Sequence, residues 1–235
     1  MKARRFVTAA LCMFFALTAA AQVTKAPVAK TPAAKTTGTR VKITTSMGVM
    51  IVRLYDATPL HRDNFLKLAK AHFFDSLLFH RVINGFMIQG GDPLSKNAQP
   101  GEQLGMGGGD MARIPAEFNP SLIHKKGVLA AARDENPERA SSACQFYLVQ
   151  GKKMTDVEIN QMECRVRNTN PEFSYTDAQR NIYKTIGGTA FLDMNYTVFG
   201  EIEKGLDVID KIAATPTAPG DRPLQDIRMK IEIIK

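Results

Sequence analysis

Apolar and polar side chains alternate along residues 41–45, and residues 49–55 are mostly apolar and rich in β-branched side chains. A period of two residues is typical of a β-strand with one buried face, and the Ser-Met-Gly segment between the two runs favours a tight turn. This pattern predicts a β-hairpin. Thr58 and Pro59 then precede apolar residues at helical spacing, which predicts an amphipathic helix with Thr58 as its N-cap that extends to about Ala71.

Further apolar runs predict three more strands and one more helix. The strands are expected over residues 145–149, 197–202 and 227–234, and the helix over residues 206–213. The pattern alone therefore predicts a mixed, β-rich domain. About 196 residues follow residue 39, which is enough for one domain with a sizeable core.

The chain opens with three positive charges, continues with a short apolar run and then has three consecutive alanines before Gln22. This order predicts a secretory signal peptide over residues 1–21, cleaved near Ala21-Gln22, and therefore an exported, periplasmic protein. An uncleaved membrane anchor is the alternative, although the apolar run is shorter than the ~20 residues that span a bilayer.

Residues 22–39 consist mainly of Ala, Pro, Lys and Thr without apolar periodicity. Such a segment cannot bury enough apolar surface to offset the entropy lost on ordering, so we expect a flexible linker before a domain at residues 40–235. The whole chain carries 31 Lys and Arg against 23 Asp and Glu, but six of the positive charges precede residue 40. The domain itself has a net charge of about +2, which argues against nucleic acid as a partner.

The most informative stretch is residues 79–92, Phe-His-Arg-Val-Ile-Asn-Gly-Phe-Met-Ile-Gln-Gly-Gly-Asp. It places a charged donor, Arg81, near the amide of Gln89 and two large apolar residues, Phe86 and Met87. An arginine keeps its proton in proteins and acts as a donor rather than as a base. The stretch holds no nucleophile and no metal-ligand spacing. It suits the stabilisation of a polar group in an apolar cleft without covalent chemistry.

This stretch resembles the F-H-R-x-I-x-G-F-x-x-Q-G-G-D pattern of the cyclophilins, the barrel-fold peptidyl-prolyl isomerases. Further segments resemble the family's blocks in the family's order, at residues 58–65, 127–132, 141–147, 191–193 and 196–200. The resemblance covers residues 40–235 apart from one insertion. It implies a mainly β fold, a closed eight-stranded antiparallel β-barrel capped by two helices. It also implies a peptidyl-prolyl cis-trans isomerase that uses no cofactor and no metal ion.

The resemblance also implies roles for single residues. Arg81 matches the catalytic arginine, and Gln89 is expected to help orient the substrate carbonyl. Large apolar side chains match the family's proline pocket, at Phe86, Met87, Tyr147 and Leu192. The other substrate-binding positions are Ala132, whose backbone would pair with the peptide, and Arg133, Gln145, Phe191 and Tyr196.

Four of these positions differ from the family's usual residues. Tyr147 stands in place of Phe, so its hydroxyl needs a partner at or beyond the pocket floor, where it would narrow the proline site or point outward. Arg133 replaces Asn, which matters little if backbone atoms bind the peptide there. Phe191 replaces the Trp of eukaryotic relatives, which predicts weak binding of cyclosporin-type inhibitors. Tyr196 replaces a His at the pocket edge.

Residues 152–188 form the insertion, where many relatives have a short turn. Within it, the segments that begin at Thr155 and Thr176 each have the pattern of a capped helix start. We therefore expect two short helices beside the active face. They either add a surface for substrate or partner or only stabilise the fold, and the sequence leaves both open.

Histidine and cysteine complete the candidate chemistry. The four histidines after residue 39 lack metal-ligand spacing. His80 is expected to be structural, because neighbours in a strand point to opposite faces and Arg81 would then face the other way. Cys144 and Cys164 can pair in an exported protein or remain free, and the sequence does not decide.

Two functions remain open. The first is an enzyme that isomerises X-Pro bonds in unfolded or partly folded exported proteins and so assists their folding. The second is a chaperone or scaffold module that holds proline-containing segments, with incidental turnover. Arg81 favours the enzyme, because binding alone does not require a donor aimed at a twisted amide. In either case we expect a monomer without membrane insertion after signal cleavage.

Overall fold

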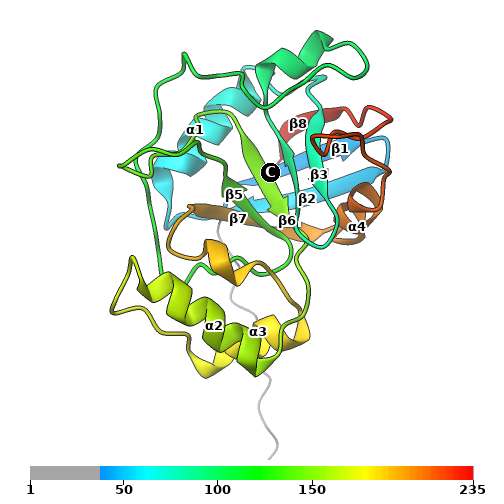
Figure 1. Ribbon diagram of the computed structural model, residues 1–235. Coiled ribbons are helices and arrows are strands. Elements are labelled where there is room, and N and C mark those ends of the chain that lie inside the picture. Colours follow the sequence, from blue (N-terminus) through cyan, green and yellow to red (C-terminus); the bar gives the residue numbers. More distant parts are fainter. Residues whose placement is uncertain (1–37, 235) are drawn as a thin grey trace, which may run out of the picture. The chain divides into compact units, whose positions relative to one another are not determined.

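The computed structural model describes residues 38–234, so the predicted signal peptide and residues 22–37 of the predicted linker lie outside the described residues. Within that range eight strands form one sheet in the order β3-β4-β6-β5-β7-β2-β1-β8, and all neighbouring strands are antiparallel (Figure 1). The strands are β1 (Arg40–Thr45), β2 (Gly48–Leu54), β3 (Phe79–Ile83), β4 (Met87–Gly90), β5 (Val128–Ala131), β6 (Phe146–Val149), β7 (Val198–Lys204) and β8 (Met229–Ile234).

The same residues form six helices. They are α1 (Pro59–Lys70), α2 (Asp156–Arg167), α3 (Asp177–Thr185), α4 (Asp207–Ala213) and the two short 3-10 helices η1 (Pro93–Asn97) and η2 (Ala190–Leu192). Helix α1 packs against β7 and β8, and α4 packs against β2, β3 and β4, so the two helices predicted to cap the barrel are both present. None of the helices in residues 38–234 has the length and apolarity that crossing a membrane requires.

The sheet is strongly curled, and its two outer strands, β3 and β8, meet across a short seam. The N–H of Phe79 donates to the carbonyl of Ile227 at 2.9 Å, and the N–H of Met229 donates to the carbonyl of Leu77 at 2.8 Å. A single bridge pairs Leu78 with Arg228 between them. The predicted eight-stranded antiparallel barrel is confirmed, with a closure that rests on this seam rather than on a full ladder.

The predicted first hairpin and first helix are both present. Strand β1 pairs with β2 through the predicted turn, where Thr45 lies opposite Gly48. Helix α1 begins after Thr58, but the Thr58 side chain makes no capping hydrogen bond. The carboxylate of Glu117 accepts instead from the N–H groups of Leu60 and His61, each at 3.0 Å. The position of the N-cap was therefore predicted correctly. The prediction that the Thr58 side chain caps the helix was wrong, because Glu117 from a distant loop accepts the hydrogen bonds instead.

A cluster of phenylalanines fills the barrel under α1. The ring of Phe146 on β6 meets the rings of Phe65, Phe74 and Phe79 edge-on, with centroids 5.4, 5.6 and 6.3 Å away. Phe146 itself is 1% exposed. Edge-to-face pairs at these distances add to the free energy gained from apolar burial. The cluster fixes β6, the strand that also carries Tyr147 on its other face.

The insertion folds as the two predicted helices, α2 and α3, which lie together at one end of the domain (Figure 1). Thr155 with Glu158, and Thr176 with Gln179, each form a complete capping box. The pair has an apolar cluster of its own, which is separate from the barrel core and includes Ile123, Ile159, Val166, Phe173, Tyr175, Tyr183 and Ala190. The insertion is thus a small packed unit whose helices start where the sequence indicates.

The packing of the aromatic cluster predicts how much stability is lost when its central ring, Phe146, is removed. Phe146→Ala should lower the free energy of unfolding by about 3–5 kcal/mol, because three edge-on ring contacts are lost and the cavity left behind cannot close. Urea denaturation followed by circular dichroism measures this. Leu224→Ala, at a side chain that is 67% exposed, is the control and should change the free energy by less than about 0.5 kcal/mol. Similar losses in the two variants would contradict this view of the core.

Candidate active site

One row of paired residues across the sheet carries the core of the candidate site. Arg81 on β3 pairs with Gln89 on β4, Gln89 pairs with Tyr147 on β6, and Tyr147 pairs with Ala130 on β5. Residues that lie directly opposite each other on antiparallel strands place their side chains on the same face. Because Phe146 points into the barrel, this row faces outward. Arg81 and Tyr147 are far apart in the sequence, but only β4 lies between their strands in the sheet.

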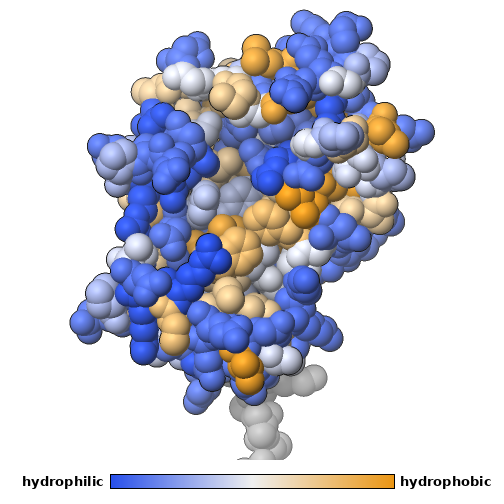
Figure 2. Space-filling model, in the orientation of Figure 1, coloured by the Kyte–Doolittle hydropathy of each residue, from blue (hydrophilic) through white to orange (hydrophobic). Residues whose placement is uncertain are grey.

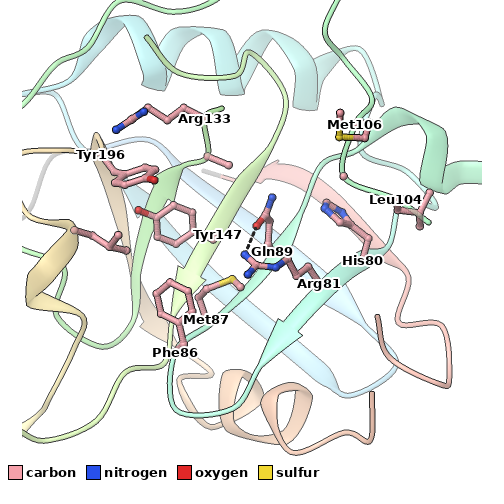
Figure 3. A pocket seen from close by; sticks show the side chains of 13 residues that line it. His80, Arg81, Phe86, Met87, Gln89, Leu104, Met106, Arg133, Tyr147 and Tyr196 are labelled. Atoms are coloured by element: carbon pink, nitrogen blue, oxygen red, sulfur yellow. Dashed lines mark hydrogen bonds between the residues drawn. The ribbon is translucent and has the colours of Figure 1, made fainter. Parts of the chain in front are cut away.

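A cavity of about 330 Å³, the central cavity, lies over this row. Nine of the eleven predicted site residues line it: Arg81, Phe86, Met87, Gln89, Ala132, Arg133, Tyr147, Leu192 and Tyr196. Figure 3 shows the arginine and its glutamine on one side and the two tyrosines opposite. Figure 2 shows apolar residues gathered in the middle of this face, bordered by hydrophilic ones. A cavity of this size with apolar walls and a few polar groups is typical of a small-ligand site.

Arg81 is held from two sides and keeps part of its guanidinium free. Its Nε donates to Oδ2 of Asp221 at 3.2 Å, and its Nη1 lies 3.5 Å from Oε1 of Gln89 (Figure 3). Within residues 38–234 its Nη2 donates no hydrogen bond, and the side chain is 42% exposed. The guanidinium is therefore oriented at the cavity edge with one nitrogen available to a ligand.

Gln89 is fixed in turn by a second amide. Its Nε2 donates to Oε1 of Gln145 at 3.0 Å, and Nε2 of Gln145 lies 2.9 Å from the carbonyl of Gly105 and 3.0 Å from that of Gly107. These bonds settle which end of each amide is oxygen, so Oε1 of Gln89 faces Arg81. Gln145 was predicted in the substrate site, but it lies behind Gln89 and lines a neighbouring cavity with the glycine loop.

The hydroxyl of Tyr147 points away from the central cavity. It lies 3.0 Å from Nε2 of His124, and both side chains are buried. The ring alone forms cavity wall, and burial raises the pKa of the hydroxyl well above its usual value. Of the two alternatives for this residue, a narrowed pocket or an outward hydroxyl, the second is confirmed.

The backbone beside the cavity differs from the prediction. The N–H of Ala132 donates to the carbonyl of Gln145 at 2.9 Å, and its carbonyl accepts from Ser142 at 2.8 Å. In the described part of the chain, the backbone of Arg133 has no hydrogen bond of this kind. The free N–H and C=O groups therefore belong to Arg133, one residue after the predicted position. Its guanidinium lies over the ring of Tyr196, 4.6 Å from the centroid.

Phe191 does not line the central cavity. Its ring lies 5.5 Å from that of Phe86, and the guanidinium of Arg165 from α2 lies 5.6 Å from its centroid. It lines a separate cavity of about 290 Å³ between the β3–β4 turn and the insertion. Its contribution to the central cavity is indirect, because it supports the ring of Phe86, which lines both cavities.

The cavity also contains residues that the sequence reasoning missed. They are His80, Leu104, Gly105 and Met106. The interpretation that His80 points to the opposite face was wrong. The register between β3 and β4 shifts between Phe79 and Arg81, so His80 is the extra residue of a β-bulge and the alternation of faces fails there. Burial lowers the pKa of His80 to about 4.

Metal and thiol chemistry find no support among residues 38–234. No three His, Cys, Asp or Glu side chains come together there as a possible metal site. Cys144 is buried and Cys164 is exposed, and both are free thiols, which settles the question that the sequence left open. Burial raises the pKa of the Cys144 thiol and so disfavours the reactive thiolate.

Comparisons with known proteins agree with the fold. The family model for cyclophilin-type peptidyl-prolyl cis-trans isomerases matches residues 40–233. A Staphylococcus saprophyticus protein named as a peptidyl-prolyl cis-trans isomerase is 32% identical over 204 residues, which cover 84% of this chain and 94% of the relative. A protein of the same description from Staphylococcus haemolyticus is 31% identical over 191 residues, covering 80% and 87%.

A solved structure shows the same fold. The cyclophilin-type peptidyl-prolyl cis-trans isomerase of Cryptosporidium parvum aligns with a TM-score of 0.59 at 21% identity, covering 85% of this chain and 99% of that chain. The barrel, the motif that builds the cavity and these sequence matches agree with one another. This chain belongs to the cyclophilin-type peptidyl-prolyl cis-trans isomerase family and is a peptidyl-prolyl cis-trans isomerase.

Proposed function

We propose that this isomerase acts on X-Pro bonds of unfolded or partly folded exported polypeptides and that Arg81 is its catalytic residue. The observation that carries the proposal is the guanidinium at the edge of the central cavity, anchored through Nε and Nη1 with Nη2 available. The cavity's apolar walls suit the ring of a proline, and the free backbone groups of Arg133 suit an extended peptide beside it.

The reaction needs no covalent step. Rotation about a peptide bond meets a barrier of ~18–20 kcal/mol because the C–N bond has partial double-bond character. The cis and trans forms of an X-Pro bond are close in energy, yet they exchange over tens to hundreds of seconds. A catalyst must therefore bind the twisted amide more tightly than either planar form.

Arg81 can supply that preference. When the amide twists, the proline nitrogen loses conjugation and regains a lone pair that can accept a hydrogen bond. A fixed guanidinium at an apolar cavity donates to this nitrogen, or to a nearby carbonyl, without reorganisation of its own. In this scheme Gln89 holds the guanidinium through Oε1, and Phe86, Met87 and the ring of Tyr147 hold the proline.

The predicted N-terminal signal peptide supports a location outside the cytoplasm. In the proposal the substrates are polypeptides that complete folding in the periplasm, and residues 22–39 separate the enzyme from the cleavage site. The partners are proline-containing chains, bound one at a time by a monomer.

Arg81→Ala tests the catalytic role. It should lower kcat/KM on an Ala-Pro peptide by about 10²- to 10³-fold, the usual effect of removing one preorganised donor, and leave the Kd for the peptide within about threefold. Exchange NMR gives the rate and titration gives the Kd. Arg62→Ala is the control, since this arginine lies on α1 with Asp56 and Asp63 as its partners, and it should leave both constants unchanged. A parallel collapse of binding and activity would favour the proline-binding module instead.

The proposed mechanism also predicts a flat pH profile. An arginine keeps its proton, His80 in the cavity wall has its pKa lowered to about 4, and burial moves the Tyr147 pKa upward. No group at the cavity then changes charge near neutrality, so kcat/KM should vary by less than about twofold from about pH 6 to pH 9. A direct NMR assay avoids the pH dependence of a coupled protease. A transition with a midpoint near 6.5 would show that a histidine takes part.

Export has a separate test. When the whole chain is expressed in a Gram-negative host, intact-mass measurement of the protein released by osmotic shock should show a chain that starts at Gln22. A variant without residues 2–21 should stay in the cytoplasm and keep full isomerase activity on the same peptide. A full-length mass in the membrane fraction would instead support the uncleaved anchor.

A further inference from the structure

A continuous chain of buried hydrogen bonds joins the central cavity to the insertion. It begins at the hydroxyl of Tyr147, 3.0 Å from Nε2 of His124, and continues from Nδ1 of His124 to Oδ1 of Asp193 at 2.7 Å. The other carboxylate oxygen, Oδ2, accepts from the hydroxyls of Tyr175 and Tyr183, each at 2.6 Å. Tyr183 belongs to α3 and Tyr175 comes just before it, so the chain ends inside the insertion.

The direction of each hydrogen bond follows from Asp193. A carboxylate only accepts, so Nδ1 of His124 carries a proton and donates to it. In a neutral imidazole the other ring nitrogen is an acceptor, and the hydroxyl of Tyr147 then donates to Nε2. The backbone N–H of His124 also donates to Oδ1, at 2.7 Å. Asp193 therefore accepts four hydrogen bonds, which fills both of its oxygens.

All five side chains are shielded from water. The exposed fraction is 0% for His124 and Tyr183, 2% for Asp193, and 5% for Tyr147 and Tyr175. A buried polar group that loses its partner finds no water in exchange, so each bond constrains the groups on either side of it. The hydroxyl of Tyr175 also lies 3.1 Å from the carbonyl of Ala190, so the chain is tied to the backbone of the segment that holds Asp193.

Asp193 also lies in the segment that forms one side of the cavity. It directly follows Leu192, its N–H donates to the carbonyl of Ala190 at 3.2 Å, and its carbonyl accepts from the side-chain amide of Asn195 at 3.1 Å. Leu192 and Tyr196 on either side of it line the cavity. Asp193 is therefore connected to three side chains that line the cavity. It is joined to Leu192 and Tyr196 through the backbone, and to Tyr147 through His124.

We propose that Asp193 is a positioning residue for the proline site and that the insertion acts on the site through it. The inference rests on the proposed function, in which the central cavity holds the substrate proline. Tyr175 and Tyr183 hold the carboxylate, the carboxylate orients the imidazole of His124, and His124 holds the ring of Tyr147 at the cavity wall. In this view the insertion supports the cavity wall at Tyr147. The sequence left open whether the insertion adds a binding surface or only stabilises the fold.

This role predicts a particular change in the kinetic constants. The ring of Tyr147 contacts the proline side chain, which keeps its shape while the preceding bond rotates. Its contribution to binding is therefore similar in the planar and twisted states, and losing it raises KM more than it lowers kcat. Removal of the Arg81 donor has the opposite signature.

Tyr183→Phe is the first test, because it removes one hydroxyl from α3 and keeps the ring. In the whole protein, KM and the Kd for an Ala-Pro peptide should rise about three- to tenfold, the effect of about one hydrogen bond, while kcat changes less than about twofold. Tyr175→Phe should act in the same way. Unchanged KM and Kd in both variants would overturn the proposal.

A double-mutant cycle tests the route. In a Tyr147→Phe background the chain is already cut at the cavity, so adding Tyr183→Phe should raise KM by less than about twofold. Fully additive effects would overturn the proposal. Val166→Ala is the matched control, since it loosens the same apolar cluster of the insertion without removing a hydroxyl, and KM should stay as in the wild type. An equal rise in KM in this control would mean that any loosening is sufficient, and that also overturns the proposal.

The failure of this inference is distinguishable from failure of the proposed function. An active wild type, an inactive Arg81→Ala variant and unaffected tyrosine variants would refute only the role of Asp193. An inactive wild type would refute the proposed function, and the peptide Kd of the Tyr183→Phe variant would still decide whether Asp193 positions the cavity.

Discussion

The site depends on the antiparallel pairing of β4 with β3 on one side and β6 on the other. This register puts Arg81, Gln89 and Tyr147 in one row on the outer face of the barrel. A slip of β4 by one residue would turn Gln89 into the core and bring Ile88 to the outer face. The end of β4 is held by Gly91, whose φ is +93° and where a Cβ atom would lie 2.1 Å from the carbonyl oxygen of Cys144. Gly91 is thus needed for the close approach of two backbones.

The inner face of the barrel forms the packed core, and the outer face carries the candidate site. The inner face holds β6 in place through the aromatic cluster around Phe146, and the outer face presents a donor at the edge of an apolar cavity. In the proposed mechanism no covalent step is needed, because the barrier comes from the loss of amide conjugation and the fixed donor stabilises the twisted amide. Asp221 and Gln89 hold the donor, and the chain of bonds through Asp193 supports the opposite wall.

Local features of this fold could be predicted from the sequence, whereas long-range partners could not. The first hairpin, the extent of α1 and both capping boxes of the insertion depend on residues within one turn of each other. Resemblance supplied the residues around Arg81. Three contacts join residues that are 23 to 140 positions apart and form only once the barrel has closed. They are the cap of α1 by Glu117, the ion pair of Arg81 with Asp221, and the hydrogen bond of Tyr147 with His124.

The position of His80 was predicted wrongly because a bulge breaks the alternation on which the prediction rested. The backbone of Ala132 is engaged by Gln145 and Ser142, partners 10 or more positions away that the sequence did not indicate.

In the proposed mechanism Arg81 stabilises the twisted amide and not the bound planar peptide. The most direct test is the rate of cis-trans exchange of an Ala-Pro peptide while it is bound, measured by exchange NMR at saturating enzyme, in the wild type and in Arg81→Lys. Lysine keeps the positive charge but loses the rigid fork that Asp221 and Gln89 orient. If Arg81 stabilises the twisted amide, exchange in the bound state slows by about tenfold or more at unchanged occupancy. Equal exchange rates in the two proteins would contradict it.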